Sequence, residues 1–194
     1  MEDKKQIRKQ MLALRNAMTH DEVVQKSEAI VQKVLQTNEY KEAQNILLYA
    51  DYCHEVMTRA LFEDALLHKK KVYFPKSDGL TNTMEFYQVV SVKQLFEGYK
   101  GIREPKEDAG KRFVWNPCED TLAIIPGVAF DTRGYRVGYG KGFYDKYFSN
   151  KRPITMMALA FANQITEEGI PTDEHDIKMD KVITEEIIYS FLRI

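Results

Sequence analysis

The chain has few cysteines and lacks any long apolar run. Its 194 residues include two cysteines, Cys53 and Cys118, which fit neither a C-x-x-C pair nor a zinc-ligand spacing. We therefore expect reduced thiols rather than a disulfide framework or a structural zinc site. No apolar stretch approaches membrane-spanning length, and the first residues, Met1-Glu2-Asp3, lack the apolar region of an export signal. These absences predict a cytoplasmic protein without a membrane partner.

An excess of charge of one sign is also missing. The 28 basic and 29 acidic residues give a net charge of −1, so we expect no broad basic surface for nucleic acid or membrane, and any anion site must be local. Internal repeats, low-complexity tracts and Ser/Gly linkers are absent too. With 44% hydrophobic and 29% charged residues, the composition is that of an ordinary soluble domain, and we predict a single domain over residues 1–194.

The chain does contain alternating helical and extended patterns. Helices are predicted at 3–18, 21–35 with Asp21 as N-cap, and 56–68, and strands at 45–50, 71–74 ending at Pro75, 84–89, 122–125, 155–161 and 182–184. Strand, helix and strand at this spacing form a βαβ unit, which favours a parallel sheet with functional groups at the strand carboxyl ends. We predict an α/β fold, a mostly parallel sheet with helices on both faces, and a long loop over 100–118.

The segment 126–148 differs in composition from the rest of the chain. It reads PGVAFDTRGYRVGYGKGFYDKYF and follows a buried-strand pattern, so its order is strand, glycine-rich loop, helix. Glycines let backbone N–H groups approach an anion, and a helix N-terminus adds unpaired N–H groups. Arg136 and Lys141 add positive charge, and Asp145, one turn after Lys141, is placed to hold Mg²⁺ against phosphate oxygens. The pattern predicts a nucleotide phosphate site.

Neither common nucleotide-binding motif fits this loop. A Walker motif has one residue fewer between its glycines and a Ser or Thr where Gly142 stands. The Rossmann fingerprint fails because Gly138, Gly140 and Gly142 alternate. Spacing alone therefore leaves two readings, an anion-binding loop of no known class and a plain glycine-rich turn.

The run P-G-x-A-F-D-x-x-G-x-R-x-G-x-G-K-G-F-Y-D resembles the signature of the 5-formyltetrahydrofolate cyclo-ligase family, also called methenyltetrahydrofolate synthetase. Further features of that family recur over nearly the whole chain: Lys4-Lys5-x-x-Arg8, Glu55, Gly101-x-x-Glu104-Pro105 and Pro171-x-x-Glu174-x-Asp176. The resemblance implies ATP- and Mg²⁺-dependent cyclisation of 5-formyltetrahydrofolate to 5,10-methenyltetrahydrofolate, with release of ADP and phosphate. ATP would be the co-substrate and Mg²⁺ the cofactor. We expect small-molecule partners and a monomer.

The resemblance also implies roles for individual residues. Those expected at ATP are Lys4, Lys5, Arg8, Arg136, Gly138, Tyr139, Gly140, Lys141, Gly142, Phe143 and Tyr144. Those expected at the folate are Ala50, Glu55, Tyr139, Gly140, Lys141, Gly142 and Phe143. Catalysis is assigned to Lys141, Arg136 and Tyr144, and Mg²⁺ to Asp145 and Asp176.

Pattern alone gives plainer readings of three of these features. The first helix has an apolar stripe of Ile7, Met11, Leu14 and Met18, and its basic residues, Arg15 included, read as a solvated face. Glu55 reads as a capping or surface residue. The segment around Asp176 reads as a solvated acidic loop, and His175 there lacks the second nearby histidine of a transition-metal site.

The chemistry of the implied reaction suits a site built from cations. A formamide is a poor electrophile, and phosphoryl transfer to its oxygen gives an iminium phosphate that N10 of the same molecule attacks. Positioning and charge neutralisation then suffice without a protein nucleophile. Two other classes stay open: a different enzyme on a similar scaffold, such as a small-molecule kinase or a sugar-phosphate isomerase, and a non-catalytic folate- or nucleotide-binding protein.

Overall fold

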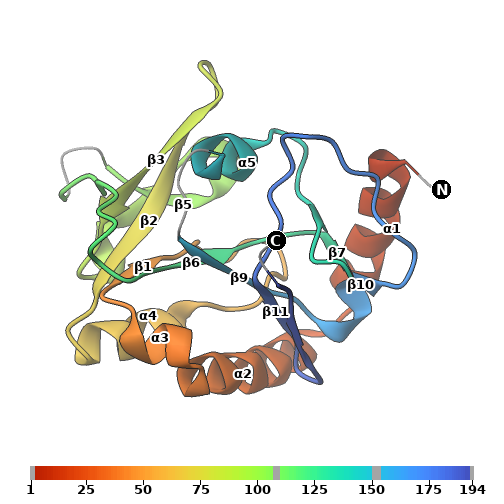
Figure 1. Ribbon diagram of the computed structural model, residues 1–194, viewed down its shortest axis with the longest axis horizontal. Coiled ribbons are helices and arrows are strands. Elements are labelled where there is room, and N and C mark those ends of the chain that lie inside the picture. The colour runs from red at the N-terminus through yellow and green to blue at the C-terminus, as the bar shows by residue number, and fades with distance from the viewer. Residues whose placement is uncertain (1–2, 107–109, 150–153, 193–194) are drawn as a thin grey trace.

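A mostly parallel β-sheet forms the centre of the protein. The computed structural model describes residues 3–106, 110–149 and 154–192 (Figure 1). The sheet has seven strands in the order β12-β11-β9-β6-β1-β2-β3. Their bounds are β1 (Asn45–Leu47), β2 (Lys71–Asp78), β3 (Thr83–Gln88), β6 (Thr121–Ile125), β9 (Thr155–Leu159), β11 (Lys181–Ile183) and β12 (Ile188–Ser190). The inner strands pair in parallel, and only the edge strands β3 and β12 run antiparallel.

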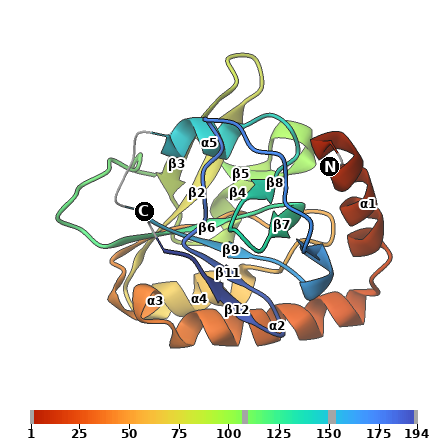
Figure 2. The same ribbon diagram turned by 45° about the vertical axis from the view of Figure 1, so that its right-hand side comes forward.

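Helices lie on both faces of this sheet, so the predicted α/β fold is confirmed. On one face lie α2 (His20–Gln36), α3 (Asn38–Glu42) and α4 (Arg59–Leu67), and on the other lies α5 (Phe143–Phe148) (Figure 1). A separate helix, α1 (Lys4–Asn16), stands at one side of the sheet (Figure 2). It packs beside a small sheet of β7 (Ala129–Asp131), β8 (Arg136–Val137) and β10 (Ile165–Thr166). In the described part of the chain, no helix combines the length and the apolar character that crossing a membrane requires.

Shorter elements complete the chain. An antiparallel pair is formed by β4 (Leu95–Glu97) and β5 (Arg103–Pro105), and 3₁₀ turns occur at η1 (Val92–Gln94), η2 (Tyr99–Gly101) and η3 (Ala162–Gln164). The expectation of a loop throughout 100–118 is therefore wrong at β5. This strand forms because it pairs with β4. Each strand has only three residues, too few for a strand pattern to be recognised in the sequence.

Side chains of the central strands alternate between two buried clusters. Ile46 and Ile124 belong to the cluster beneath α2 and α4, whereas Leu47 and Ile125 belong to the cluster beneath α5. Because both faces are covered, these strands read as continuous apolar runs instead of alternating ones.

Several predicted boundaries differ from the structure: β1 ends at Leu47, α4 begins at Arg59 and β9 ends at Leu159. Two further differences have a clear physical cause. The cap of α2 is Thr19, not Asp21: the Thr19 hydroxyl accepts from the Glu22 N–H at 3.3 Å, and the Glu22 carboxylate accepts from the Thr19 N–H at 2.8 Å. This reciprocal capping box satisfies two N–H groups that a helix leaves unpaired. In the sheet, β2 continues beyond Pro75, because past Tyr73 it pairs only with the edge strand β3, a place that tolerates proline.

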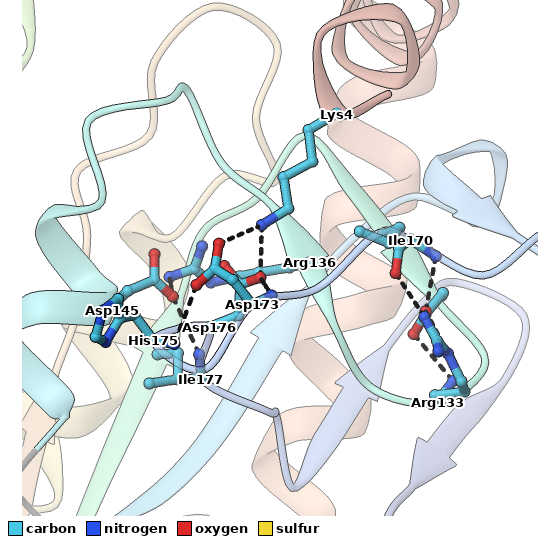
Figure 3. A network of polar contacts seen from close by, with 10 residues as sticks. Lys4, Arg133, Arg136, Asp145, Ile170, Asp173, His175, Asp176 and Ile177 are labelled. Carbon is cyan, nitrogen blue, oxygen red and sulfur yellow. Dashed lines mark hydrogen bonds and ion pairs between the residues drawn. The ribbon is translucent and has the colours of Figure 1, made fainter. Parts of the chain in front are cut away.

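A buried carboxylate fixes the turn between β7 and β8. Asp131 is 1% exposed and accepts hydrogen bonds from the N–H groups of Arg133, Tyr135 and Ile170 at 2.9 to 3.0 Å. The Arg133 guanidinium donates to the same carboxylate at 2.7 Å and to the Ile170 carbonyl at 2.6 Å (Figure 3). Asp131 thereby joins the start of the glycine-rich segment to the chain that leads to Asp176.

Replacing Asp131 with alanine should destabilise the protein. Because several backbone N–H groups would lose their acceptor, we expect Asp131→Ala to lower the free energy of unfolding by about 2 to 4 kcal/mol. Urea denaturation compared with Glu28→Ala, a change on the exposed side of α2, measures this effect. Equal stability of the two variants would show that the Asp131 contacts contribute little.

Candidate functional site

A cavity of about 470 Å³ opens where β1 and β6 end. Residues that follow β1, Tyr49 to Glu55, form one wall, and the chain from Pro126 through the glycine-rich loop forms another. The cavity thus lies at the carboxyl ends of parallel strands, where α/β folds place ligands. Its volume is in the range of small-molecule sites.

Most of the predicted site residues line this one cavity. They are Lys4, Arg8, Ala50, Glu55, Arg136, Gly138, Tyr139, Gly140, Lys141, Gly142, Phe143, Tyr144, Asp145 and Asp176. Lys5 is exposed and lies outside the lining, because one residue along a helix turns a side chain by about 100° from Lys4. Its contact with ATP stays a prediction.

The glycine-rich loop contains two left-handed backbone positions. Gly140 has φ 97° and Gly142, the N-cap of α5, has φ 67°, a region that costs other residues about 1–2 kcal/mol. The Gly140 backbone faces the Arg8 guanidinium, which a Cβ at this position would contact at 3.4 Å. Since α5 has only six residues, side chains must supply most of the positive charge at the loop.

Helix α1 contacts this loop through basic side chains. Arg8 Nε donates to the Gly138 carbonyl at 2.7 Å. One turn earlier, Lys4 Nζ lies 2.5 Å from Asp176 and 3.4 Å from Asp173 (Figure 3). The N-terminal helix and the central loop, far apart in sequence, therefore meet at the same cavity.

Two of the cavity's cations, Lys4 and Arg136, each form an ion pair with a carboxylate. Arg136 is buried, and its Nη2 lies 3.1 Å from Asp145 Oδ1, which also accepts from the Ile177 N–H at 3.2 Å (Figure 3). Asp176 is bound by Lys4 and by the Asp173 N–H at 2.9 Å. Each of the two carboxylates assigned to the metal is thus paired with a cation assigned to phosphate.

The donor set suits a hard cation held partly by a nucleotide. Within the described residues, no three His, Cys, Asp or Glu side chains gather into a metal site. Asp145 and Asp176 on one cavity wall supply two carboxylates, and Mg²⁺ normally binds through one or two carboxylates, water and substrate phosphates. The residues therefore fit Mg²⁺ bound together with phosphate and do not fit a zinc centre.

A buried carboxyl group, Glu55, also lines the cavity. It is 8% exposed and accepts from the Tyr52 N–H at 3.0 Å. Burial raises the pKa of Glu55 to about 7, although the nearby Arg15 cation and the Tyr139 hydroxyl favour its ionised form. A carboxyl group near neutral pKa in a cavity is a candidate functional group.

Arg15 is a site residue that the sequence pattern missed. It was expected on a solvated face, yet it is 1% exposed, while Leu14 of the predicted apolar stripe is 50% exposed. Arg15 Nη2 donates to the Tyr139 hydroxyl at 2.6 Å, and Nη1 lies 3.9 Å from Glu55. Its spacing of seven residues from Arg8 was the available signal, because that spacing returns to the same helix face.

Glu104 lines the cavity, although no role is predicted for it from the sequence. It accepts from the N–H groups of Ser77 at 3.1 Å and Tyr99 at 3.4 Å, and burial raises its pKa. A Cβ on Gly98 would lie 2.5 Å from its carboxylate, so a larger residue there would displace the Glu104 side chain. Trp115 packs against the cluster beneath α5.

Residues 1–185 match the sequence model of the 5-formyltetrahydrofolate cyclo-ligase family. The chain belongs to this family. It is 30% identical over 192 residues to the 5-formyltetrahydrofolate cyclo-ligase of Mus musculus, with 94% of each chain covered, and 28% identical to that of Haemophilus influenzae, with 93% of this chain and 96% of that protein covered. The NMR structure of Aquifex aeolicus 5,10-methenyltetrahydrofolate synthetase superposes with a TM-score of 0.82 at 33% identity, covering 96% of this chain and 92% of that one. The prediction of an enzyme of the cyclo-ligase family is confirmed.

Membership of the cyclo-ligase family leaves the compartment open. One relative, from Arabidopsis thaliana, is named as a mitochondrial cyclo-ligase and is 28% identical over 186 residues. The cytoplasmic location and the monomeric state of this cyclo-ligase family member stay predictions.

The raised pKa of Glu55 predicts a pH-dependent stability. The folded state binds the Glu55 proton more tightly than the unfolded state, whose pKa is 4.5, so this group's contribution to stability falls as pH rises from about 4.5 to about 7. Glu55→Gln removes that contribution. As pH rises over this range, we expect the free energy of unfolding of Glu55→Gln to increase relative to that of the wild type, by at most about 1.4 kcal/mol per pH unit. Denaturation at several pH values measures this difference. A constant difference between the two proteins at every pH would rule out a raised pKa.

Proposed function

We propose that this protein catalyses the ATP- and Mg²⁺-dependent cyclisation of 5-formyltetrahydrofolate to 5,10-methenyltetrahydrofolate, with release of ADP and phosphate. One observation carries the proposal: a single cavity is lined by four cationic side chains and two carboxylates of α1, the glycine-rich segment and the acidic loop, and also by the buried Glu55 carboxyl group and aromatic rings. Family membership supports the same reaction, because the relatives are named for it.

The cationic end of the cavity suits a triphosphate. Lys4 and Arg8 approach it from α1, and Arg136 and Lys141 approach it from the glycine-rich loop. Full positive charges in a partly closed site stabilise the charge that develops during phosphoryl transfer. Asp145 and Asp176 would hold Mg²⁺, which supplies charge neutralisation between the phosphate oxygens.

The other end suits a pterin. A pterin ring presents N–H donors along one edge, and the Glu55 carboxylate next to Ala50 is an acceptor for such donors. The rings of Tyr139 and Phe143 line the space between the two ends, and flat aromatic side chains pack well against a planar heterocycle. This arrangement brings the formyl group to the terminal phosphate.

The reaction then needs two bond exchanges. The formyl oxygen attacks the γ-phosphorus, the bond from phosphorus to the bridging oxygen breaks, and ADP leaves. N10 attacks the activated formyl carbon, loses its proton, and the carbon–oxygen bond breaks to release phosphate. Lys141 and Arg136 neutralise the transferred phosphoryl group, so no protein nucleophile is required.

Tyr144 lies next to the cation that we assign to catalysis. The Arg136 guanidinium lies 5.8 Å from the centre of its ring, and burial raises the pKa of the Tyr144 hydroxyl. The hydroxyl therefore keeps its proton at neutral pH and is available as a hydrogen-bond donor to an anionic ligand. We assign Tyr144 to orienting Arg136 and the phosphoryl group.

The direct test is incubation of the purified protein with MgATP and 5-formyltetrahydrofolate. We expect methenyl absorbance, ADP and free phosphate to appear in equal amounts. A phosphorylated product without the methenyl chromophore would indicate a kinase instead. Binding of both ligands without ATP consumption would indicate a non-catalytic binding protein.

Removing the Lys141 charge should slow turnover strongly. Loss of one charged contact to the transferred group lowers the rate by about 10²–10³, so we expect kcat of Lys141→Ala to fall by that factor. Lys146→Ala is the matched control, since Lys146 is exposed on the following helix and lies outside the described cavity lining. Near-normal kcat for Lys141→Ala would remove this residue from the catalytic assignment.

A further inference from the structure

We propose that Arg15 is a positioning residue that holds Glu55 and Tyr139 together, so that the folate end and the nucleotide loop are organised by one buried cation. The inference rests on the proposed function of the cavity and adds a residue that does not line it. The three side chains come from separate parts of the chain: α1, the segment after β1 and the glycine-rich loop. Arg15 is the link between them.

The contacts of Arg15 favour this role over simple packing. Its guanidinium is 1% exposed, donates to the Tyr139 hydroxyl at 2.6 Å and lies 5.8 Å from the centre of the Tyr139 ring. Glu55 is the one carboxylate found within 4.0 Å of it among the described residues, at 3.9 Å. A cation that is buried beside a single carboxylate is costly unless its charge is balanced, so Arg15 and Glu55 depend on each other.

Arg15 also acts on the protonation of Glu55. The groups that face this carboxyl are the Arg15 cation, the hydroxyls of Tyr139, Tyr49 and Tyr144, and the Asp51 carboxylate. Burial and Asp51 raise the pKa of Glu55, whereas Arg15 and the Tyr139 hydroxyl lower it, and the balance is about 7. Without Arg15 the carboxyl group would be protonated at neutral pH and would lose acceptor capacity toward the N–H donors of a pterin.

The second contact of Arg15 reaches the nucleotide loop. Tyr139 lies between Gly138, whose carbonyl accepts from Arg8, and Gly140, whose backbone faces the Arg8 guanidinium. Arg8 therefore holds the backbone of this loop while Arg15 holds the side chain at its middle. A ligand that orders Glu55 and Tyr139 at one end thus favours the loop conformation at the other, and such coupling is reciprocal.

The test compares three substitutions in the full-length protein. Arg15→Met removes the charge at similar volume, Arg15→Lys keeps it, and Lys9→Met, on the exposed side of α1, is the matched control. The first readout is the pKa of Glu55, obtained by monitoring its side-chain carboxyl ¹³C NMR signal during a pH titration without any ligand. We expect Arg15→Met to raise the pKa of Glu55 by at least one unit, Arg15→Lys to restore most of the wild-type value, and Lys9→Met to leave it unchanged.

The second readout is the equilibrium affinity for 5-formyltetrahydrofolate between pH 6 and pH 8.5. For a rise of one pKa unit we expect Arg15→Met to bind about ten-fold more weakly near pH 6, with the loss shrinking to less than about two-fold by pH 8.5, because the ionised fraction of Glu55 falls ten-fold per pKa unit only at pH values below both pKa values. A loss of equal size at every pH, not rescued by Arg15→Lys, would overturn the proposal in favour of a purely structural role. Unchanged titration and unchanged affinity would overturn it as well.

Two features keep the inference separate from the function on which it rests. The NMR titration needs no turnover, so a wild-type protein that fails to cyclise the folate would refute the proposed function and leave the Glu55 result standing. If Arg15→Met does not fold, Tyr139→Phe removes the hydroxyl that Arg15 holds while keeping the ring. We then expect a smaller rise in the pKa of Glu55, and no rise would contradict the proposed chain of contacts.

Discussion

The site depends on the docking of α1 against the glycine-rich loop. Without this contact, the loop would present Arg136 and Lys141 alone, and the carboxylates of the acidic loop would lack Lys4 as a partner. The hydrogen bond from Arg8 to the Gly138 carbonyl fixes where the two segments meet. Gly140 and Gly142 have left-handed φ values that other residues rarely adopt, so the loop conformation at this contact depends on glycine.

Charge balance explains how so many ionised groups share one cavity. In the described structure Lys4 is paired with Asp176 and Arg136 with Asp145, so two of the four cations are neutralised, whereas Arg8 and Lys141 keep the phosphate site positive before any ligand arrives. When a magnesium nucleotide binds, its phosphates can pair with the cations and its Mg²⁺ with the carboxylates. The ion pairs within the protein are then replaced by ion pairs with the ligand. Arg15 and Glu55 form a third ion pair, and because both side chains are buried, solvent screens their charges poorly.

The sequence predicted the sheet and the loop better than the side of α1 that is buried. Strands such as β6 are readable because they are continuous apolar runs, and the loop is readable because its glycines and cations are adjacent in sequence. The burial of Arg15 and Glu104 could not be predicted from the sequence, because it arises from contacts between distant segments. Leu14 and Arg15 differ from the predicted pattern because Arg15 contacts Tyr139 and Glu55, whereas the other stripe residues, Ile7, Met11 and Met18, do pack against the apolar clusters.

The most direct test of this account is hydrogen–deuterium exchange of the protein with and without Mg²⁺ and a non-hydrolysable ATP analogue. If α1 and the glycine-rich loop bind the same triphosphate, amide exchange will slow in both Lys4–Asn16 and the loop residues 136–142. Protection confined to the loop, with α1 exchanging at its ligand-free rate, would contradict the claim that these two segments form one nucleotide site.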